Sequence, residues 1–415
     1  MNKLLNKIKE IYLSNFEKYF YFGKGVHLIK KFFFYKNFNT KKKKENLVKD
    51  KKNLRVGFVT TWNTKCGIAI IPSKYIVEEL IRRGIKVTVL SEKTNIITER
   101  DENFVRRCWS RNKFDYGPII EEMKKKKINV VHIEFEASIF LDEYMFIRFL
   151  DKLDKMKIRI ILSLHVIGRY IDKHLDKVAD VVIIHNPKLK KFVKNYKKLE
   201  NKLYYLNLGV PLIKDEDKKT ARKYLKIKSK HVIAYSGFLS GYKNFLDVIK
   251  AIKIIKEQIQ DILFILASSK HPYYPYNGKD NLYKKFEEII KDYQLKDNLL
   301  LIKKFLSEEE KFRILHAGDI LISYNDAFNL SQSGSVKALI ASNRPVITSN
   351  NIFYADMDKG VVKIENKNPK ILAKTIIELF ENKKMYRQVR QQGKQFIEEN
   401  NFEKITDKLI KLYLR

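Results

Sequence analysis

The chain has 415 residues, 45% of them hydrophobic, which is more than one ordinary core requires and indicates two domains. Lys and Arg outnumber Asp and Glu by 84 to 48, a net charge of +36, while 12% aromatic content with 15 Gly and 8 Pro excludes disorder throughout. Two cysteines, Cys66 and Cys108, exclude a disulfide framework and a four-ligand zinc site built on cysteine, and favour a reduced, cytoplasmic chain.

Residues 1–53 read as a separate basic and aromatic arm, with 15 Lys against 4 acidic residues (net +11) and 11 Phe or Tyr. Apolar residues at helical spacing predict helices, and a KKKK run at 41–44 predicts a solvated linker. This composition suits an anionic membrane surface, where each Lys contributes about 1 kcal/mol. Peripheral contact at the inner face of the membrane and packing of the arm on the main body are the two alternatives. The arm lacks the apolar core of a signal peptide, and no run of 18 apolar residues predicts a transmembrane span.

From residue 54, short β-rich runs alternate with helical stretches, the first helix being expected near 69–83. Near-continuous apolar strands separated by amphipathic helices are typical of a parallel sheet covered on both faces. The predicted strands are 55–61, 86–91, 129–135, 159–165, 181–185 and 203–208. A charged stretch after Pro211 then predicts a domain boundary, so the first domain is expected to span 54–212.

The same alternation restarts in residues 213–383. The predicted strands are 231–238, 262–269, 298–305, 319–325, 345–350 and 361–365, and the predicted helices lie near 243–257, 281–293, 307–316, 333–342 and 368–381. Residues 384–415 read as a helical tail that packs back on the first domain. The predicted fold is therefore α/β, with two Rossmann-like doubly wound domains facing a central cleft, where ligands of such sheets bind at strand-end loops.

Three strand-end loops are candidate ligand sites, although neither GxGxxG after a strand nor GxxxxGK[ST] occurs. The first loop, at 60–76, runs through Gly67 into a helix whose amides would attract an anion. The second, at 236–251, carries Gly237, Gly241 and Lys243, and a lysine at a helix start suits a diphosphate. The alternative for the first loop is an ordinary turn between a strand and a helix. The alternative for the second is that Lys243 is one surface lysine among many.

The third loop, at 319–350, combines polar side chains with a helix that opens at Ser333 and Gly334. Its amides would form an anion site in the cleft, and a well-capped helix after a polar loop is the alternative. The polar residues before the helix are Asp326, Asn329, Ser331 and Gln332.

The histidines divide by position. His132 lies inside an apolar strand and is expected in the core, whereas His165 ends its strand where ligands bind. His185 also ends a strand. The acidic run at 215–217 follows no buried strand, so we expect it to be solvated, and no metal site is predicted.

Seven segments, taken in order, resemble the group 1 glycosyltransferases, which are nucleotide-sugar-dependent, retaining enzymes with the GT-B fold. The resemblance covers about 54–410. The segments are CGIA (66–69), VVHIEFEASIF (130–140), LSLH (162–165), ADVVIIHNP (179–187), NLGVP (207–211), SGFLSGYKN (236–244) and AGDILISYNDAFNLSQSGSVKALIASNRPVIT (317–348).

The resemblance implies an acceptor-side first domain and a donor-binding second domain. Lys243 would bind the donor diphosphate and, with His165 near the sugar, form the catalytic pair. The implied donor-binding residues are Gly67, Gly237, Lys243, Asp326, Asn329, Gln332, Ser333 and Gly334, and the implied acceptor-side residues are Cys66, Glu136 and His165.

Two departures from the family pattern are clear. Many members carry two carboxylates at the positions of Asn329 and Lys337, the second of which grips the donor ribose. An arginine that usually precedes the lysine is also missing, because Phe238 and Leu239 stand there. Asp326, Asn329 and Gln332 would then supply the polar contacts.

The sequence thus predicts a hexosyltransferase that moves sugar from a nucleoside-diphosphate sugar to a glycan, lipid-linked or cell-surface acceptor, with retention and with neither metal nor cofactor. A non-catalytic GT-B relative that binds nucleotide sugar or glycan is the alternative. Nucleic-acid binding is disfavoured, because the positive charge is dispersed and no recognised module is present.

Overall fold

The computed structural model describes residues 50–111, 114–167, 169–193, 196–239, 244–270, 282–326, 332–357, 359–365 and 367–415. Residues 44–415 form one compact unit. The predicted arm lies outside the described residues except for its last four, which include the short helix η1 (Lys51–Asn53). Within the described part of the chain, no helix is both long and apolar enough to cross a membrane.

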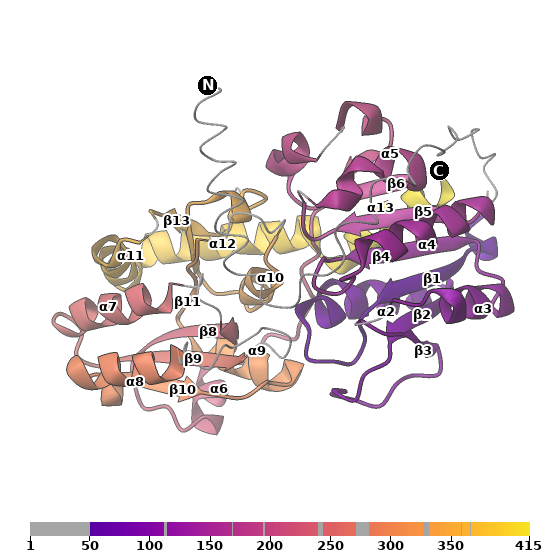
Figure 1. The fold of residues 1–415 in the computed structure, drawn as a ribbon. Helices are drawn as coiled ribbons and strands as arrows, with labels where there is room; N and C mark the ends of the chain where they lie inside the picture. Colours follow the sequence, from indigo (N-terminus) through magenta and orange to yellow (C-terminus); the bar gives the residue numbers. More distant parts are fainter. Residues whose placement is uncertain are drawn as a thin grey trace, which may run out of the picture. The chain divides into compact units, whose positions relative to one another are not determined.

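The first half of this unit holds a seven-stranded parallel sheet in the order β3-β2-β1-β4-β5-β6-β7 (Figure 1). Its strands are β1 (Arg55–Thr60), β2 (Lys86–Glu92), β3 (Val105–Trp109), β4 (Val130–Phe135), β5 (Arg159–Leu164), β6 (Val181–Ile184) and β7 (Leu203–Tyr205). Every residue of β4 is buried, as expected for a central strand covered on both faces. The helices between the strands are η2 (Ala69–Lys74), α2 (Tyr75–Arg82), α3 (Gly117–Lys125), α4 (Glu143–Lys155), η3 (Tyr170–Lys173), α5 (Leu175–Val178), η4 (Pro187–Phe192) and η5 (Tyr196–Leu199).

The second half holds a six-stranded parallel sheet in the order β10-β9-β8-β11-β12-β13. Its strands are β8 (His231–Leu239), β9 (Ile262–Lys270), β10 (Leu299–Ile302), β11 (Ile320–Ser323), β12 (Val346–Ser349) and β13 (Val362–Ile364). The helices are α6 (Lys218–Tyr224), α7 (Phe245–Lys256), α8 (Leu282–Asp292), η6 (Lys296–Asn298), α9 (Glu308–Ala317), α10 (Gly334–Ala341), η7 (Ile352–Tyr354) and α11 (Pro369–Glu381). The predicted boundary at 212/213 falls between the two sheets and stays a prediction.

Alternation along β8 explains how the second sheet joins two cores. Val232 and Ala234 pack into a cluster that extends into the first half of the unit. Ile233 and Tyr235 point to the opposite face and pack against α7 and α11. Because successive side chains of a strand point to opposite faces, one nearly uniform apolar run supplies both cores.

Two differences from the predicted elements lie in the first half of this unit. The helix expected near 69–83 is interrupted at Ile71, whose φ of −119° and ψ of 112° are extended. Pro72 follows it, and a residue before proline is pushed away from helical backbone angles. The edge strand β3 was not predicted, because Arg106 and Arg107 break the apolar pattern of this short segment.

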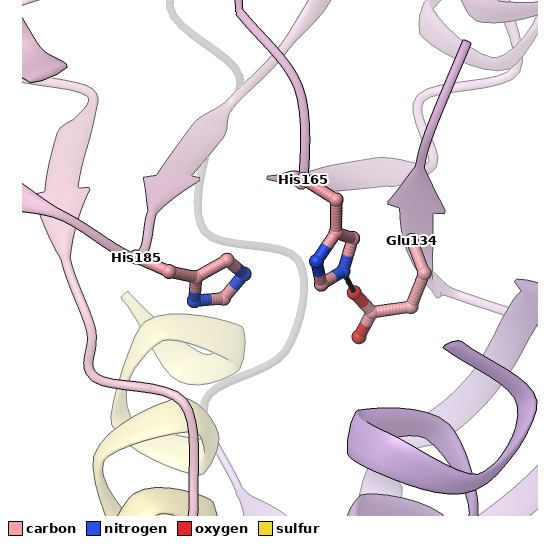
Figure 2. Close-up of side chains that lie close together, drawn as sticks. All are labelled: Glu134, His165 and His185. Carbon is pink, nitrogen blue, oxygen red and sulfur yellow. Dashed lines mark hydrogen bonds and ion pairs between the residues drawn. The ribbon is translucent and has the colours of Figure 1, made fainter. Parts of the chain in front are cut away.

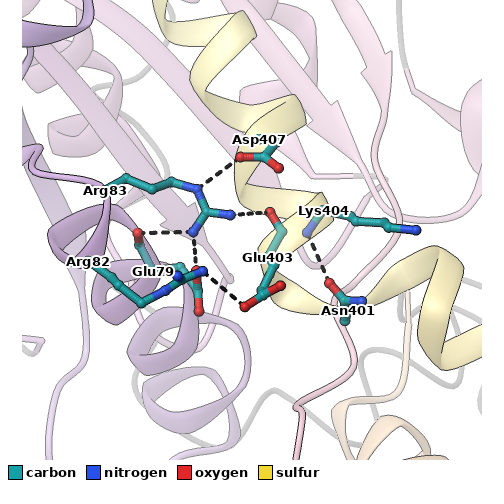
Figure 3. Close-up of polar contacts among 7 residues, drawn as sticks. All are labelled: Glu79, Arg82, Arg83, Asn401, Glu403, Lys404 and Asp407. Atoms are coloured by element: carbon teal, nitrogen blue, oxygen red, sulfur yellow. Dashed lines mark hydrogen bonds and ion pairs between the residues drawn. The ribbon is translucent and has the colours of Figure 1, made fainter.

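The last two helices, α12 (Lys383–Asn400) and α13 (Phe402–Leu414), return the chain to the first sheet. Asn401 separates them and caps α13, and Val210 pairs with this junction through its backbone. A polar cluster then joins α13 to α2 (Figure 3): Arg83 donates to Asp407 at 2.9 Å and to the Glu403 carbonyl at 2.8 Å. Further along α13, the Leu412 carbonyl accepts hydrogen bonds from Arg159 of β5.

Candidate functional site

The candidate site of the first domain lies where four neighbouring strands end. β1, β4, β5 and β6 are adjacent and parallel, so their carboxyl ends meet at one edge of the sheet. His165 and His185 directly follow the last residues of β5 and β6, and Glu134 is the penultimate residue of β4. The order of the strands therefore brings together three titratable side chains that are far apart in sequence.

Glu134 and His165 form the central contact of this edge (Figure 2). Glu134 Oε2 lies 2.6 Å from His165 Nε2, and the Glu134 side chain is fully buried while that of His165 is 11% exposed. The His165 backbone amide also donates to the Phe135 carbonyl at 2.9 Å. Both the backbone and the ring of His165 are thus fixed by β4.

The other oxygen of Glu134 faces a second histidine. Glu134 Oε1 lies 3.2 Å from His132 Nε2, an electrostatic contact whose angles do not meet hydrogen-bond geometry. His132 Nδ1 is 2.6 Å from the hydroxyl of Tyr413, on α13. A buried polar chain therefore runs from the last helix through two residues of β4 to His165.

The two histidines also affect the ionisation of Glu134. Burial raises the pKa of the Glu134 carboxyl, but its contacts with His132 and with His165 together hold that pKa well below its usual range. Glu134 is therefore an ionised carboxylate that can only accept hydrogen bonds.

His185 is a neutral partner of this group. Its Nδ1 lies 2.9 Å from the Leu206 carbonyl and its Nε2 lies 3.0 Å from Ser163 Oγ. A carbonyl only accepts, so Nδ1 carries the hydrogen and Nε2 accepts from the serine. Burial lowers the pKa of His185 to about 3. The rings of His165 and His185 stack with centroids 4.9 Å apart.

Glu134, His165 and His185 offer ligand atoms within 4.8 Å of one another, which raises the question of a metal ion. The 2.6 Å between Glu134 Oε2 and His165 Nε2 is shorter than the roughly 3.3 Å between tetrahedral ligands that each lie about 2.0 Å from zinc. Both ring nitrogens of His185 are also engaged. We therefore interpret Glu134 and His165 as a hydrogen-bonded pair against which His185 stacks, and not as a metal site.

The loop after β1 carries two of the predicted residues. Gly67 is exposed, and a Cβ built on it would meet no heavy atom within 4 Å, so a ligand has access to the backbone here. Cys66 is buried, and burial raises its thiol pKa. Because Pro72 interrupts the first turn, the amides after Gly67 do not open a continuous helix as predicted.

Side chains that the sequence analysis did not single out hold this loop in place. Trp62 Nε1 donates to Glu102 at 2.8 Å. Arg107 donates to both oxygens of Asp101 at 2.7 Å and to the Trp62 carbonyl at 3.0 Å. The bidentate pair with Asp101 fixes the orientation of Arg107, which in turn joins Trp62 of the loop to β3.

Glu136, the remaining residue predicted on the acceptor side, directly follows β4. Its carboxylate accepts from the amide of Ser138 at 2.8 Å and from the hydroxyl of the same residue. Glu136 thus shapes its own loop and remains half-buried.

In the second domain, two central predictions lie outside the described residues, namely Lys243 and Asn329. Gly237 lies in β8, and its carbonyl accepts from Ser268 Oγ at 2.8 Å. Asp326 follows β11 and pairs with Lys367 at 3.1 Å.

Ser333 and Gly334 open α10, and the Ser333 side chain caps the helix by accepting from the Val336 amide at 3.2 Å. A Cβ built on Gly334 would lie 3.6 Å from atoms of Ile71. The start of α10 therefore packs beside the loop that follows Gly67.

Gln332, predicted as a donor contact, hydrogen bonds to the segment that links the two sheets. Its Oε1 accepts from the Leu208 amide at 2.9 Å and its Nε2 donates to Asn207 at 3.0 Å. Asn207 in turn donates to Asn400 at 2.9 Å. Gln332 therefore connects the start of α10 to residues 207–208 and, through Asn207, to Asn400 at the end of α12.

Lys337 is buried inside the second domain. Its ammonium pairs with Asp356 and lies 4.7 Å from the centre of the Phe396 ring. The residue predicted to replace a carboxylate of the family pattern is therefore a buried lysine paired with an aspartate.

Two parallel sheets followed by helices that return to the first domain define the GT-B fold. Residues 216–396 match the family model described as Glycosyl transferases group 1. The resemblance to group 1 glycosyltransferases predicted from the sequence is thus confirmed, as is the predicted α/β fold class.

Solved structures with this fold cover nearly the whole chain. A glycosyltransferase from Rickettsia africae is 15% identical with a TM-score of 0.68, covering 87% of this chain and 98% of its own. HepE from Anabaena in complex with UDP and glucose is 10% identical with a TM-score of 0.66, and the match covers 87% of this chain and 99% of HepE. Sucrose-phosphate synthase from Thermosynechococcus elongatus is 15% identical with a TM-score of 0.66, and the match covers 87% of this chain and 98% of the synthase. At these identities the likeness is one of fold.

Proposed function

We propose that this protein is a retaining glycosyltransferase that moves a hexosyl group from a nucleoside-diphosphate sugar to a hydroxyl of a glycan, lipid-linked or cell-surface acceptor. The observation that carries the proposal is the group 1 family match over 216–396 on a chain with the GT-B fold. HepE was crystallised with UDP and glucose, which makes UDP-hexoses the first donors to test.

The proposed reaction exchanges one carbon–oxygen bond for another. The bond between the anomeric carbon and the diphosphate breaks, and a bond from the acceptor oxygen to that carbon forms. The departing diphosphate gathers negative charge and takes up the proton of the acceptor hydroxyl. Lys243 and the amides at the start of α10 would stabilise this charge, and preorganised donors of this kind need no metal. Persistence of transfer in excess EDTA would support the metal-free route.

A non-catalytic relative that binds nucleotide sugar is the second candidate. The pairing of Lys337 with Asp356 favours it, because the ribose-binding carboxylate of many family members is missing at that position. Binding across a donor and acceptor panel without release of any product would select this candidate.

The deciding experiment is a donor screen by thermal shift, followed by mass analysis of the product formed with the best donor. We expect a UDP-hexose to raise the melting temperature and Lys243→Ala to reduce that rise by removing a point charge from the diphosphate. Lys250→Ala, on the exposed face of α7, is the matched control and should leave the rise unchanged. An equal rise in the wild type and in Lys243→Ala would remove Lys243 from the donor site.

A further inference from the structure

We infer that Glu134 is a positioning residue for His165: it holds the imidazole with Nε2–H toward β4 and presents Nδ1 to the edge where the strands end. The inference rests on the proposed function, in which His165 lies near the transferred sugar. Neither sequence motifs nor the family match assign a role to Glu134.

The contact between the two residues fixes both the ring and its tautomer. A buried, ionised carboxylate accepts hydrogen bonds and donates none, so the 2.6 Å contact requires a hydrogen on His165 Nε2. Nδ1 is then the ring nitrogen left to contact a ligand. A hydrogen bond to an ionised acceptor is about twice as strong as a neutral one, so this orientation is strongly preferred.

The carboxylate is itself held from its other side. Glu134 Oε1 faces His132 at 3.2 Å, and His132 is bound to Tyr413 and packs against the ring of Phe58 at 4.6 Å. With contacts on both oxygens and no exposure to solvent, the carboxylate has one available orientation. Burying such a charge costs several kcal/mol, and apolar residues of similar volume often serve stability equally well. A role in orienting His165 accounts for a carboxylate at this position.

The first test is NMR of the full chain with histidine-selective ¹⁵N labelling. We expect the wild type to give a ring N–H signal from His165 Nε2 that is protected from exchange and shifted downfield, assigned by its loss in His165→Gln. In Glu134→Met this signal should disappear, and in Glu134→Gln it should move upfield because the acceptor becomes neutral. Glu92→Gln alters another buried carboxylate of the same sheet and should leave the signal in place.

The second test is kinetic, with the best UDP-hexose and acceptor from the donor screen. Glu134→Gln and His165→Ala should each lower kcat by about 10²-fold, as misplacement by about 1 Å does. The double variant should lose little more, because the two residues act as one unit.

The two proposals fail in different ways. An unchanged His165 N–H signal in both Glu134 variants, or a wild-type ring protonated on Nδ1 alone, would overturn the assignment of Glu134. If the fold-loss in kcat of the double variant equalled the product of the two single fold-losses, the assignment of Glu134 would be overturned as well. Absence of transfer by the wild type would instead refute the proposed function, while the NMR result would still decide the orientation of His165.

Discussion

Lys337 illustrates how a single buried charge constrains the second domain. Its side chain is fully buried on α10, and Asp356 is its only ion-pair partner among the described residues. Attraction between two buried charges offsets the cost of removing them from water only while both are present. The pair therefore links α10 firmly to the segment after β12.

We predict that Asp356→Asn destabilises the protein by about 3–5 kcal/mol, because it leaves the Lys337 ammonium buried without a counter-charge. Urea unfolding measures the loss. Lys337→Met added to Asp356→Asn should recover most of it by removing the unpaired charge. A single variant as stable as the wild type would show that the ammonium reaches solvent.

The pH dependence of this variant has a definite sign. Burial lowers the pKa of Lys337 below its ordinary value of 10.5, although Asp356 opposes the shift. Between the lowered value and 10.5 the unfolded chain binds more protons than the folded chain, so stability rises with pH in that window. Without Asp356 the rise should be steeper, which unfolding at neutral pH and just below pH 10.5 would measure.

The role of a single residue could be predicted from the sequence only where its place relative to a predicted strand indicated a ligand site. His165 follows a strand, and strand ends of parallel sheets are where ligands bind, so it was singled out. Glu134 lies within a predicted buried strand and is not among the predicted site residues. A carboxylate in an otherwise apolar strand nevertheless indicates a buried polar partner. The contact of its neighbour His132 with Tyr413 could not be predicted, since α13 lies far along the chain.

Among the elements, the linker after β7 depends on close approach to α13. Gly209 lies against the ring of Phe402, which also stacks on Tyr75 with centroids 5.0 Å apart. A side chain at 209 would overlap this ring. The absence of a side chain thus allows α13 to lie against both the linker and α2.

We predict that Gly209→Ala lowers stability by about 1–3 kcal/mol, because the methyl group forces Phe402 out of its packed position. Differential scanning calorimetry measures the change. Gly67→Ala is the matched control, since nothing lies within 4 Å of its added Cβ, and its melting temperature should stay within error of the wild type. Equal melting temperatures for all three proteins would mean that Phe402 moves aside freely.

The elements themselves were largely readable from the sequence. Apolar runs such as β4 and β9 were predicted because a covered parallel sheet requires them. β3 was not predicted because Arg106 and Arg107 make this short segment polar. The ion pairs that each arginine forms with a nearby acidic residue are visible only in the three-dimensional structure. The interruption at Ile71 follows from Pro72, since a residue before proline avoids helical backbone angles.

At the scale of the whole molecule, the two sheets are coupled by a small set of hydrogen bonds. Val210 donates to the Asn400 carbonyl at 2.8 Å and accepts from Phe402 at 3.2 Å. Tyr75 of α2 also donates to Glu308 of α9 at 3.0 Å. Gln332 hydrogen bonds to Leu208 and Asn207 of the same linker, so the residue before α10 is tied to the segment that joins the sheets.

The positive charge of residues 1–53 leads to a prediction about binding to anionic membranes. We predict that the full chain floats with vesicles containing anionic lipid and that a form lacking residues 1–53 floats less, because the arm carries +11 of the +36 charge together with its aromatic residues. Vesicles of neutral lipid are the control. Equal flotation of both forms would refute a special role for the arm.

The contact between α13 and the first sheet has a consequence for how the protein is made. His132 and Tyr413 are 281 residues apart, and the buried cluster around β1 includes Phe402, Leu409 and Tyr413. A ribosome releases the first sheet long before it releases the helix that covers part of it, at about 5–20 residues per second. The newly made first sheet must therefore wait tens of seconds with an uncovered apolar face, so its survival depends on how quickly synthesis finishes or on a chaperone that covers the face meanwhile.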